Sequence, residues 1–228
     1  MKKYLLKEYG SWAVATFSYI AGITGGSYDV NRLIIGALAC FLLINSKEAL
    51  AQWFKASKKE AAPAFFIQAL LGAIIIMFIL KDGITDFIPY MVLPILYIVF
   101  FRFKGEHFLL TEVTGFLSLG LSTLVSYYIC NAGINFTLYM VVALFFTAGV
   151  FKVRLQLRKG LFEKLTMLGY VAFLVVVYLL TGTSLVIALP LVENIFYALK
   201  PYKVKLRYTG WIELSKSLAF LILLKLYS

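Results

Sequence analysis

The run APAFFIQALLGAIIIMFIL, residues 62–80, decides the fold class of this chain. It contains no charged residue and is close to the roughly 20 apolar residues that a helix needs to cross a bilayer. Similar runs fill most of the sequence, because 62% of the 228 residues are hydrophobic and the mean hydropathy is +0.89. Soluble domains reach only about 45–50% apolar residues. Hydrocarbon offers no hydrogen-bond partner to backbone N–H and C=O groups, so these groups have to pair within helices. The sequence therefore predicts an all-α polytopic membrane protein.

Apolar runs bounded by charges or by Gly and Asn clusters predict nine transmembrane helices. Their approximate ranges are 9–25, 32–53, 62–80, 84–101, 107–130, 134–153, 162–181, 184–199 and 209–227. Several runs are shorter than an untilted span. The division at residues 181–183 is therefore the weakest, and seven or eight spans remain an alternative. No Gly/Ser-rich or Pro-rich linker marks a soluble domain, so residues 1–228 are interpreted as one transmembrane domain.

Lys and Arg are distributed unevenly over the predicted loops. If the N-terminus is cytoplasmic, the inside segments carry Lys2, Lys3, Lys7, Lys47, Lys55, Lys58, Lys59, Arg102, Lys104, Lys152, Arg154, Arg158, Lys159, Lys164, Lys200, Lys203, Lys205 and Arg207. The outside segments hold only Arg32, Lys81 and Lys225. Short cytoplasmic loops are enriched in cations. The pattern therefore predicts a multi-pass protein of the cell membrane with a cytoplasmic N-terminus.

Several functional classes are disfavoured by composition. The net charge of +11 does not indicate a nucleic-acid partner, because the charges lie between apolar runs rather than on a soluble basic face. The expected partners are membrane lipids. Cys40 and Cys130 fall inside predicted spans, which argues against a disulfide framework or a metal cluster. His107 is the sole histidine and no Walker-type loop is present, which argues against a classical hydrolase and an ATP-driven machine. No cofactor or metal is expected.

Two polar stripes lie at the ends of the second and sixth predicted helices. The first stripe, at steps of three and four, is Asn45, Glu48, Gln52 and Lys55. The second places Arg154 and Arg158 on one helix face, and Lys152, Gln156 and Lys159 on a neighbouring one. Stripes four helices apart suggest a duplicated four-helix unit. They fit equally well with ordinary helix ends whose long side chains reach back to the membrane surface.

Three carboxylates fall within or at the ends of predicted spans: Glu112, Glu193 and Glu213. An unpaired carboxylate is costly in a membrane and usually faces the bundle interior. Each is therefore expected to have a partner, and Lys216 lies one turn after Glu213. A structural ion pair and a functional site both explain such residues.

Four segments resemble the YwiC-like family of bacterial and archaeal membrane proteins. Residues 7–13, KEYGSWA, are similar to its Glu-His-Gly-Ala-Trp-Ala opening, with Tyr9 in place of the usual His. Residues 145–160 look like its tract ending in an Ile-Arg-Glu-Arg type sequence. Segments 190–194 and 210–214 extend the resemblance, although Glu193 stands where a basic residue is expected. The four segments follow the family's order.

YwiC-like proteins in turn resemble the UbiA superfamily of intramembrane prenyltransferases, which have nine helices and an internal four-helix repeat. The resemblance implies a UbiA-like helical bundle. In those enzymes, two aspartate-rich motifs after the second and sixth helices hold magnesium ions that bind an isoprenyl diphosphate. Of the first motif only Asn45 and Glu48 remain here, and the second is absent. The bundle is therefore expected without its aspartate-rich motifs.

The leading hypothesis is a cytoplasm-facing basic pocket that binds an anionic lipid-like or isoprenoid phosphate ligand without a metal. Arginine grips phosphate bidentately and needs no cation to do so. The expected ligand-binding residues are Asn45, Glu48, Gln52, Lys55, Glu112, Lys152, Arg154 and Arg158. One alternative is a divergent prenyltransferase in which Glu48 or Glu112 holds a single Mg²⁺. A small-solute transporter that uses intramembrane acids for proton coupling is another.

The charge pattern predicts that the loops containing Lys58 and Lys203 face the cytoplasm. Cysteines introduced at these two positions should resist an impermeant maleimide in intact cells and react once the membrane is permeabilised. A cysteine at Lys81, on the opposite side, should react in intact cells. Labelling of the Lys58 or Lys203 position from outside would overturn this topology.

Overall fold

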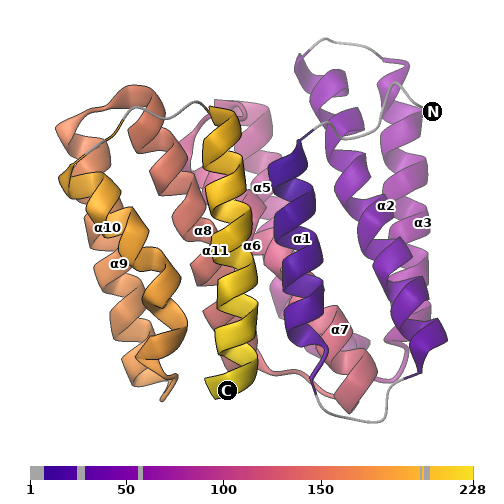
Figure 1. The fold of residues 1–228 in the computed structure, drawn as a ribbon. Helices are drawn as coiled ribbons and strands as arrows, with labels where there is room; N and C mark the ends of the chain where they lie inside the picture. Colours follow the sequence, from indigo (N-terminus) through magenta and orange to yellow (C-terminus); the bar gives the residue numbers. More distant parts are fainter. Residues whose placement is uncertain (1–7, 25–28, 56–58, 201, 203–205, 228) are drawn as a thin grey trace. The chain divides into compact units, whose positions relative to one another are not determined.

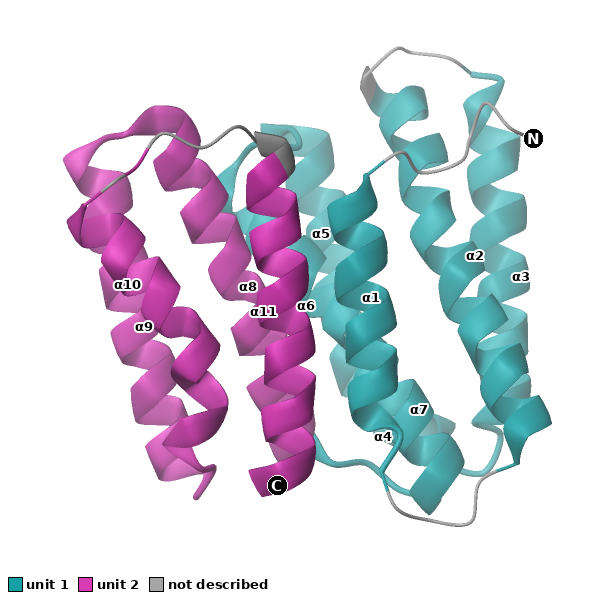
Figure 2. Cartoon of the chain, viewed as in Figure 1, with its two compact units in different colours: residues 1–136 teal, residues 137–228 magenta. Residues whose placement is uncertain are grey.

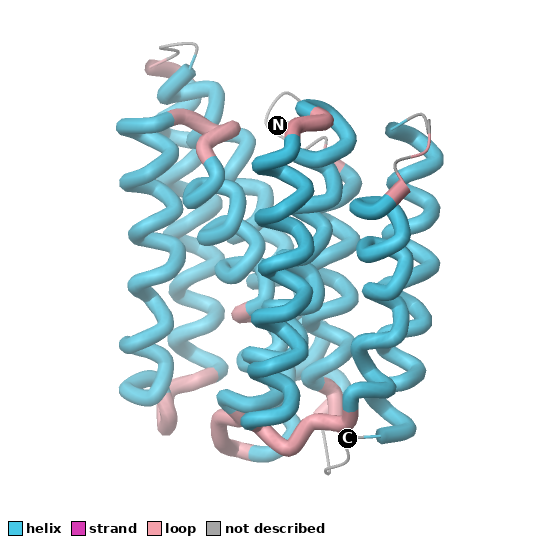
Figure 3. Tube along the Cα trace, turned by 90° about the vertical axis from the view of Figure 1, so that its left-hand side faces the viewer, coloured by secondary structure: helices cyan, strands magenta, loops and turns pink. Residues whose placement is uncertain are grey.

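The computed structural model describes residues 8–24, 29–55, 59–200, 202 and 206–227. Within these ranges the chain forms α-helices joined by short 3-10 segments and loops, without a β-strand (Figures 1 and 3). Two compact units are present, unit 1 from Met1 to Phe136 and unit 2 from Thr137 to Ser228 (Figure 2). The predicted cytoplasmic residues Lys2, Lys3, Lys7, Lys58, Lys203 and Lys205 lie outside the described residues.

Unit 1 contains the helices that match the first five predicted ranges. They are α1 (Tyr9–Gly22), α2 (Val30–Lys55), α3 (Ala61–Ile79), α4 (Ile84–Phe87), η2 (Ile88–Met91), α5 (Val92–Lys104), α6 (Leu109–Gly120) and α7 (Ser122–Asn131). The elements from Ile84 to Lys104 run on as one helical stretch, as do those from Leu109 to Asn131. The 3-10 turn of η2 has a proline near its start, where the missing N–H is tolerated.

Unit 2 contains the remaining helices: α8 (Phe136–Arg158), α9 (Leu161–Leu180), η3 (Leu185–Leu191), α10 (Val192–Leu199) and α11 (Leu206–Tyr227). The chain turns between α9 and η3 at Gly182, whose φ of 69° lies in the left-handed region that favours glycine. The Thr183 amide donates to the Tyr178 carbonyl oxygen at 2.8 Å and closes this turn. The helix boundary predicted at residues 181–183 is thus present.

A helical segment stands at each of the nine predicted ranges, with the largest difference at α8, which continues to Arg158. Within the described residues, six helices are long and apolar enough to cross a membrane: Val30–Phe54, Ala61–Ile79, Ile84–Lys104, Leu109–Asn131, Phe136–Arg158 and Leu161–Leu180. The all-α, multi-pass architecture is therefore confirmed. The α1 helix has 14 residues, and α11 carries Glu213 and Lys216, so the count of nine spans stays a prediction.

Charged side chains connect segments that meet at one end of unit 1. The Lys47 ammonium lies 2.5 Å from Glu8 Oε2 and 3.9 Å from Glu106 Oε1. These contacts join the start of α1, the last part of α2 and the α5–α6 connection. Burial by itself raises the pKa of Glu8, but Lys47 and the Ser11 hydroxyl bring that pKa below its ordinary value. The start of α1, the last part of α2 and the α5–α6 connection, which are all predicted to be cytoplasmic, therefore lie at the same end of unit 1.

Small and hydroxyl-bearing residues fill the contact between α1 and α7. The Ser122 hydroxyl donates to the Ala15 carbonyl oxygen at 3.0 Å, and the Thr123 hydroxyl donates to that of Ser18 at 2.9 Å. Gly22 faces the Thr123 carbonyl and the Ser126 hydroxyl so closely that a Cβ atom has no room. Helices in membranes commonly pack through small residues and side-chain hydroxyl groups in this way.

This close contact predicts that Gly22→Ala destabilises the protein. The added methyl group would press against the α7 backbone, and overpacking of this kind costs about 1–3 kcal/mol. Thermal unfolding in detergent measures the effect. The matched control is Gly169→Ala in α9, where no atom lies within 4 Å of the added Cβ and alanine favours the helix. If both variants were as stable as the parent, the close α1–α7 packing would be wrong.

Candidate functional site

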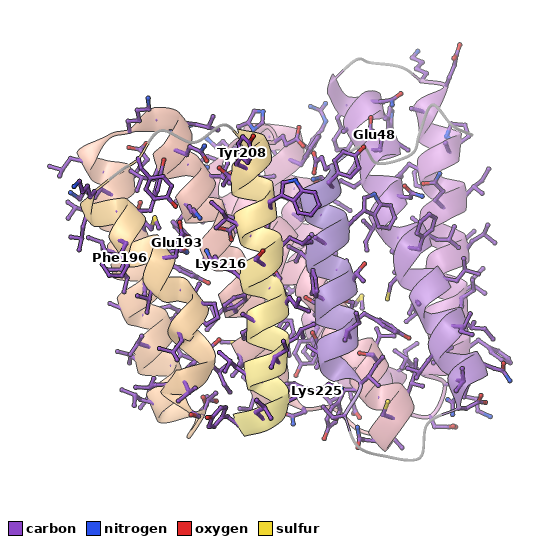
Figure 4. The ribbon with its side chains drawn as sticks, viewed as in Figure 1. Glu48, Glu193, Phe196, Tyr208, Lys216 and Lys225 are labelled. Carbon is purple, nitrogen blue, oxygen red and sulfur yellow. The ribbon has the colours of Figure 1, made fainter. Side chains whose placement is uncertain are left out.

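Four charged side chains of unit 2 meet where α8, α10 and α11 pack: Lys152, Glu193, Glu213 and Lys216, here called the charge cluster. Figure 4 labels two of them, Glu193 and Lys216. Both lysines are almost completely enclosed, with exposed fractions of 1% for Lys152 and 8% for Lys216. Charged groups at such depth are costly unless they are paired. The cluster is therefore the first place in this unit to look for function.

Each carboxylate of the cluster accepts from both ammonium groups. Glu193 Oε2 lies 2.5 Å from Lys152 Nζ and 3.3 Å from Lys216 Nζ. Glu213 Oε1 lies 2.8 Å from the ammonium nitrogen of each lysine. Positive and negative groups thus alternate, and the set as a whole is electrically neutral. Removing one member of such a set leaves a buried charge without its partner.

Neighbouring side chains extend the cluster. The Lys216 ammonium also donates to Asn194 Oδ1, and the Tyr202 hydroxyl donates to Glu193 Oε1 at 2.5 Å. Lys152 Nζ lies 5.9 Å from the ring centre of Tyr197, within range of a cation–π contact. Partial burial and the adjacent Glu193 carboxylate raise the pKa of Tyr202, which keeps its hydroxyl protonated as a donor.

Helical spacing explains why α8 and α11 meet through polar groups. Lys152 and Gln156 are one turn apart on α8, and Thr209 and Glu213 are one turn apart on α11, so each pair shares a helix face. The Thr209 hydroxyl donates to Gln156 Oε1 at 2.9 Å, while Lys152 contacts Glu213. Gly149 borders the same contact, and a Cβ there would lie at an ordinary van der Waals distance of 3.6 Å from Glu213 Oε2. The two helices are antiparallel and are joined by two polar contacts, Thr209–Gln156 and Glu213–Lys152.

The expected ligand-binding residues of unit 2 fall into two groups. Lys152 lies inside the charge cluster, between two carboxylates. Arg154 is half-buried and Arg158 is exposed, with Arg158 Nη1 3.7 Å from Glu163 Oε1 on α9. Lys152 therefore faces α11, whereas Arg158 reaches toward α9. The two arginines are the predicted residues that remain candidates for an anionic ligand at this end of α8.

The expected residues of unit 1 lie on α2 and α6. Asn45 is buried with 3% exposure, and the Gln52 amide donates to Glu48 Oε1 at 2.9 Å. Lys55 ends α2. Glu112 Oε1 lies 3.6 Å from His107 Nδ1. Because the two units are described separately, a pocket shared by these residues and the arginines of α8 stays a prediction.

Sequence reasoning found part of the cluster. It paired Glu213 with Lys216 and expected a partner for Glu193, but it placed Lys152 on the basic ligand-binding surface. The matching one-turn spacing of polar residues on α8 and α11 was the available signal for Lys152. Within the described ranges, no group of three or more His, Cys, Asp or Glu side chains is arranged to hold a metal ion.

A groove of about 400 Å³ borders the charge cluster on α11. Its lining residues are Pro190, Trp211, Ile212, Ser215, Lys216 and Ala219. Lys216 therefore belongs both to the cluster and to this mainly apolar groove.

The neutrality of the cluster predicts that Lys152→Met strongly destabilises the protein. Two carboxylates would then share one ammonium group, and breaking a buried pair costs about 3–5 kcal/mol. The double variant Lys152→Met/Glu193→Gln keeps the Glu213–Lys216 pair and should recover much of the loss in thermal unfolding. Lys225→Met, at an exposed position, is the control. Equal stability of Lys152→Met and Lys225→Met would refute the pairing.

Comparison with known proteins identifies the family from the N-terminal part of the chain. The model of the YwiC-like protein family matches residues 5–127, which is more than half of the 228 residues. The match includes the KEYGSWA segment at residues 7–13 and ends before the charge cluster. No curated protein and no solved structure matches the chain. On the extent of the family match, the chain belongs to the YwiC-like family.

Proposed function

We propose that this protein binds an amphiphile with an anionic, phosphate-bearing head group, such as an isoprenoid phosphate, and that it does so without metal-dependent prenyl transfer. The observation that carries the proposal is the position of Arg154 and Arg158 on one face in the last two turns of α8. A guanidinium group binds phosphate through two parallel hydrogen bonds and needs no metal ion.

The two arginines belong to a larger basic end of unit 2. Its described members are Arg154, Arg158, Lys159, Lys164 and Lys200. Lys164 Nζ lies 3.5 Å from the Leu199 carbonyl oxygen, which brings the start of α9 next to the end of α10. The charge cluster is neutral as a set, so the positive potential of this unit comes from its basic end. Such a surface attracts anions and concentrates them locally.

Apolar side chains beside the basic end support an amphiphile rather than a free anion. Leu157 is 61% exposed, Phe162 70% and Phe196, labelled in Figure 4, 66%. A ligand with a charged head and a hydrocarbon chain matches both features, since its chain would lie along these residues while its head meets the guanidinium groups. This combination favours a lipid-like phosphate over an inorganic one.

The proposal includes the finer topology. Nine spans with a cytoplasmic N-terminus would place the basic end at the cytoplasmic face of the cell membrane, in agreement with the positive-inside rule. A UbiA-like arrangement would add Asn45, Glu48, Gln52, Lys55 and Glu112 of unit 1 to the same pocket. In that arrangement the arginines of α8 stand where the resemblance places the second aspartate-rich motif.

The alternative function is prenyl transfer, in which a metal ion and not the two arginines would hold the phosphate. In that case Glu48 or Glu112 would bind a Mg²⁺ ion that neutralises the leaving diphosphate. Chelation of magnesium would then release the ligand. Binding by Arg154 and Arg158 alone would persist.

Accordingly, Arg154→Gln and Arg158→Gln should each weaken the binding of radiolabelled farnesyl phosphate to the purified protein. A charge-assisted hydrogen bond is worth about 1.5–3 kcal/mol, so each loss should lower affinity roughly tenfold or more. Binding by the parent protein should be unchanged by EDTA. Lys225→Gln, at the other end of unit 2, is the matched control and should bind normally.

The opposite result has a clear form. If both glutamine variants bind farnesyl phosphate normally and EDTA alone releases it, the metal-free site is wrong. The prenyltransferase alternative would then gain support.

A further inference from the structure

The connection between α8 and α9 brings a carboxylate next to one of the two arginines of the basic end. Only Lys159 and Gly160 lie between Arg158, the last residue of α8, and the start of α9. Lys159 has a left-handed φ of 54°, a conformation that commonly ends a helix. Because the connection is this short, Glu163 in the first turn of α9 comes within reach of α8. Its Oε1 atom lies 3.7 Å from Arg158 Nη1.

The Glu163 carboxylate is the enclosed partner of this pair. The exposed fraction of its side chain is 14%, against 56% for Arg158. The Glu163 Oε2 atom lies over Gly160, the residue that precedes α9, and a Cβ atom at Gly160 would have no room beside it. A carboxylate in the first turn is also stabilised by the positive end of the helix dipole. The carboxylate therefore keeps its place, and the guanidinium group is the partner that is free to turn toward a ligand.

An anionic head group that binds Arg158 has to compete with this carboxylate. A phosphate and a carboxylate bind the same edges of a guanidinium group, so the Arg158–Glu163 contact is lost when the head group binds. The Glu163 carboxylate then stays nearby as a charge of the same sign as the ligand, and the repulsion adds to the cost. Because Glu163 is largely enclosed, salt screens this repulsion less than it screens a fully exposed charge. Both effects lower the affinity of the basic end for an anion.

The loss of the Arg158–Glu163 contact costs the same for every anion that takes the arginine. Inorganic phosphate has no further contact that offsets this cost. A ligand with a hydrocarbon chain does, since Leu157 and Phe162 are exposed beside Arg158 and give the chain a surface to lie along. The competition therefore leaves a site that amphiphiles occupy and free anions do not.

We propose that Glu163 is an internal competitor for the phosphate site of the basic end: it pairs with Arg158 while the site is empty and gives the arginine up to the head group of an amphiphile. Glu163 thereby sets the affinity of the site and excludes free anions from it. This inference rests on the proposed function, because it concerns the same arginine and the same class of ligand.

Binding of radiolabelled farnesyl phosphate to the purified Glu163→Gln variant tests the proposal. Glutamine keeps the size of the side chain but removes its charge, so the affinity should rise by about fivefold, a gain that a folding defect does not produce. At trace concentrations of labelled ligand, the inorganic phosphate that displaces half of it should fall by a similar factor. Farnesol, which lacks the phosphate, should bind the parent and the variant equally. Asp82→Asn, at an exposed position of unit 1, changes the net charge by the same amount and should bind farnesyl phosphate like the parent.

A double variant shows whether Glu163 acts through Arg158. In the Arg158→Gln background there is no guanidinium group to compete for, so Arg158→Gln/Glu163→Gln should bind farnesyl phosphate within about twofold of Arg158→Gln alone. Unchanged or weaker binding by Glu163→Gln, or an undiminished gain in the Arg158→Gln background, would overturn the competition while the phosphate site itself stands. Failure of the parent to bind farnesyl phosphate, or normal binding by Arg158→Gln, would instead overturn the proposed function, and the competition with it.

Discussion

Compensation of buried charge is the constraint on which the packing of unit 2 depends. The α11 helix carries Glu213 and Lys216 in its middle, and neither can be enclosed among apolar side chains without a counterion. Glu213 and Lys216 pair with each other, and Lys152 of α8 and Glu193 of α10 form a second pair that bonds to both of them. The three helices therefore have to meet at one level, and the shared oxygen atoms of the two carboxylates fix that level to within a helical turn.

In the described part of unit 1, most of the buried polar groups are neutral hydroxyl groups, and most of these are hydrogen-bonded to backbone carbonyl oxygens. Along α6, the Thr114 hydroxyl donates to the Leu110 carbonyl oxygen at 2.7 Å. Between helices, the Tyr19 hydroxyl donates to the Leu33 carbonyl oxygen at 2.6 Å, and the Arg32 guanidinium donates to that of Ile79 at 2.9 Å. Hydroxyl groups bonded to nearby carbonyls allow close helix packing without a buried charge. Unit 2 uses such bonds as well, for example from the Tyr178 hydroxyl to the Val141 carbonyl oxygen at 2.8 Å, and adds the buried charge cluster to them.

The positions of the helices were predictable because the length of each apolar run, and the residues that interrupt it, can be read directly from the sequence. Gly182 breaks the run after α9 whatever its neighbours are, since its positive φ is a local property. The partners of Lys152 are not local: Glu193 and Glu213 lie 41 and 61 residues away in sequence. Spacing along α8 shows which residues share a face but not which helix covers that face. The sequence therefore assigned Lys152 to a basic pocket, although its neighbours are acidic.

Stability alone does not require a cluster of this kind. Replacing a buried ion pair by well-packed apolar residues is often neutral or stabilising, whereas removing a single partner is costly. Four apolar residues would suit a hydrocarbon environment as well, although Asn194 Oδ1 would then lose its Lys216 donor. The two ammonium groups and the two carboxylates instead give the cluster no net charge and connect three helices at one level. A neutral cluster differs in this respect from the excess positive charge at the basic end of the same unit, so an anion would be attracted to the basic end and not to the cluster.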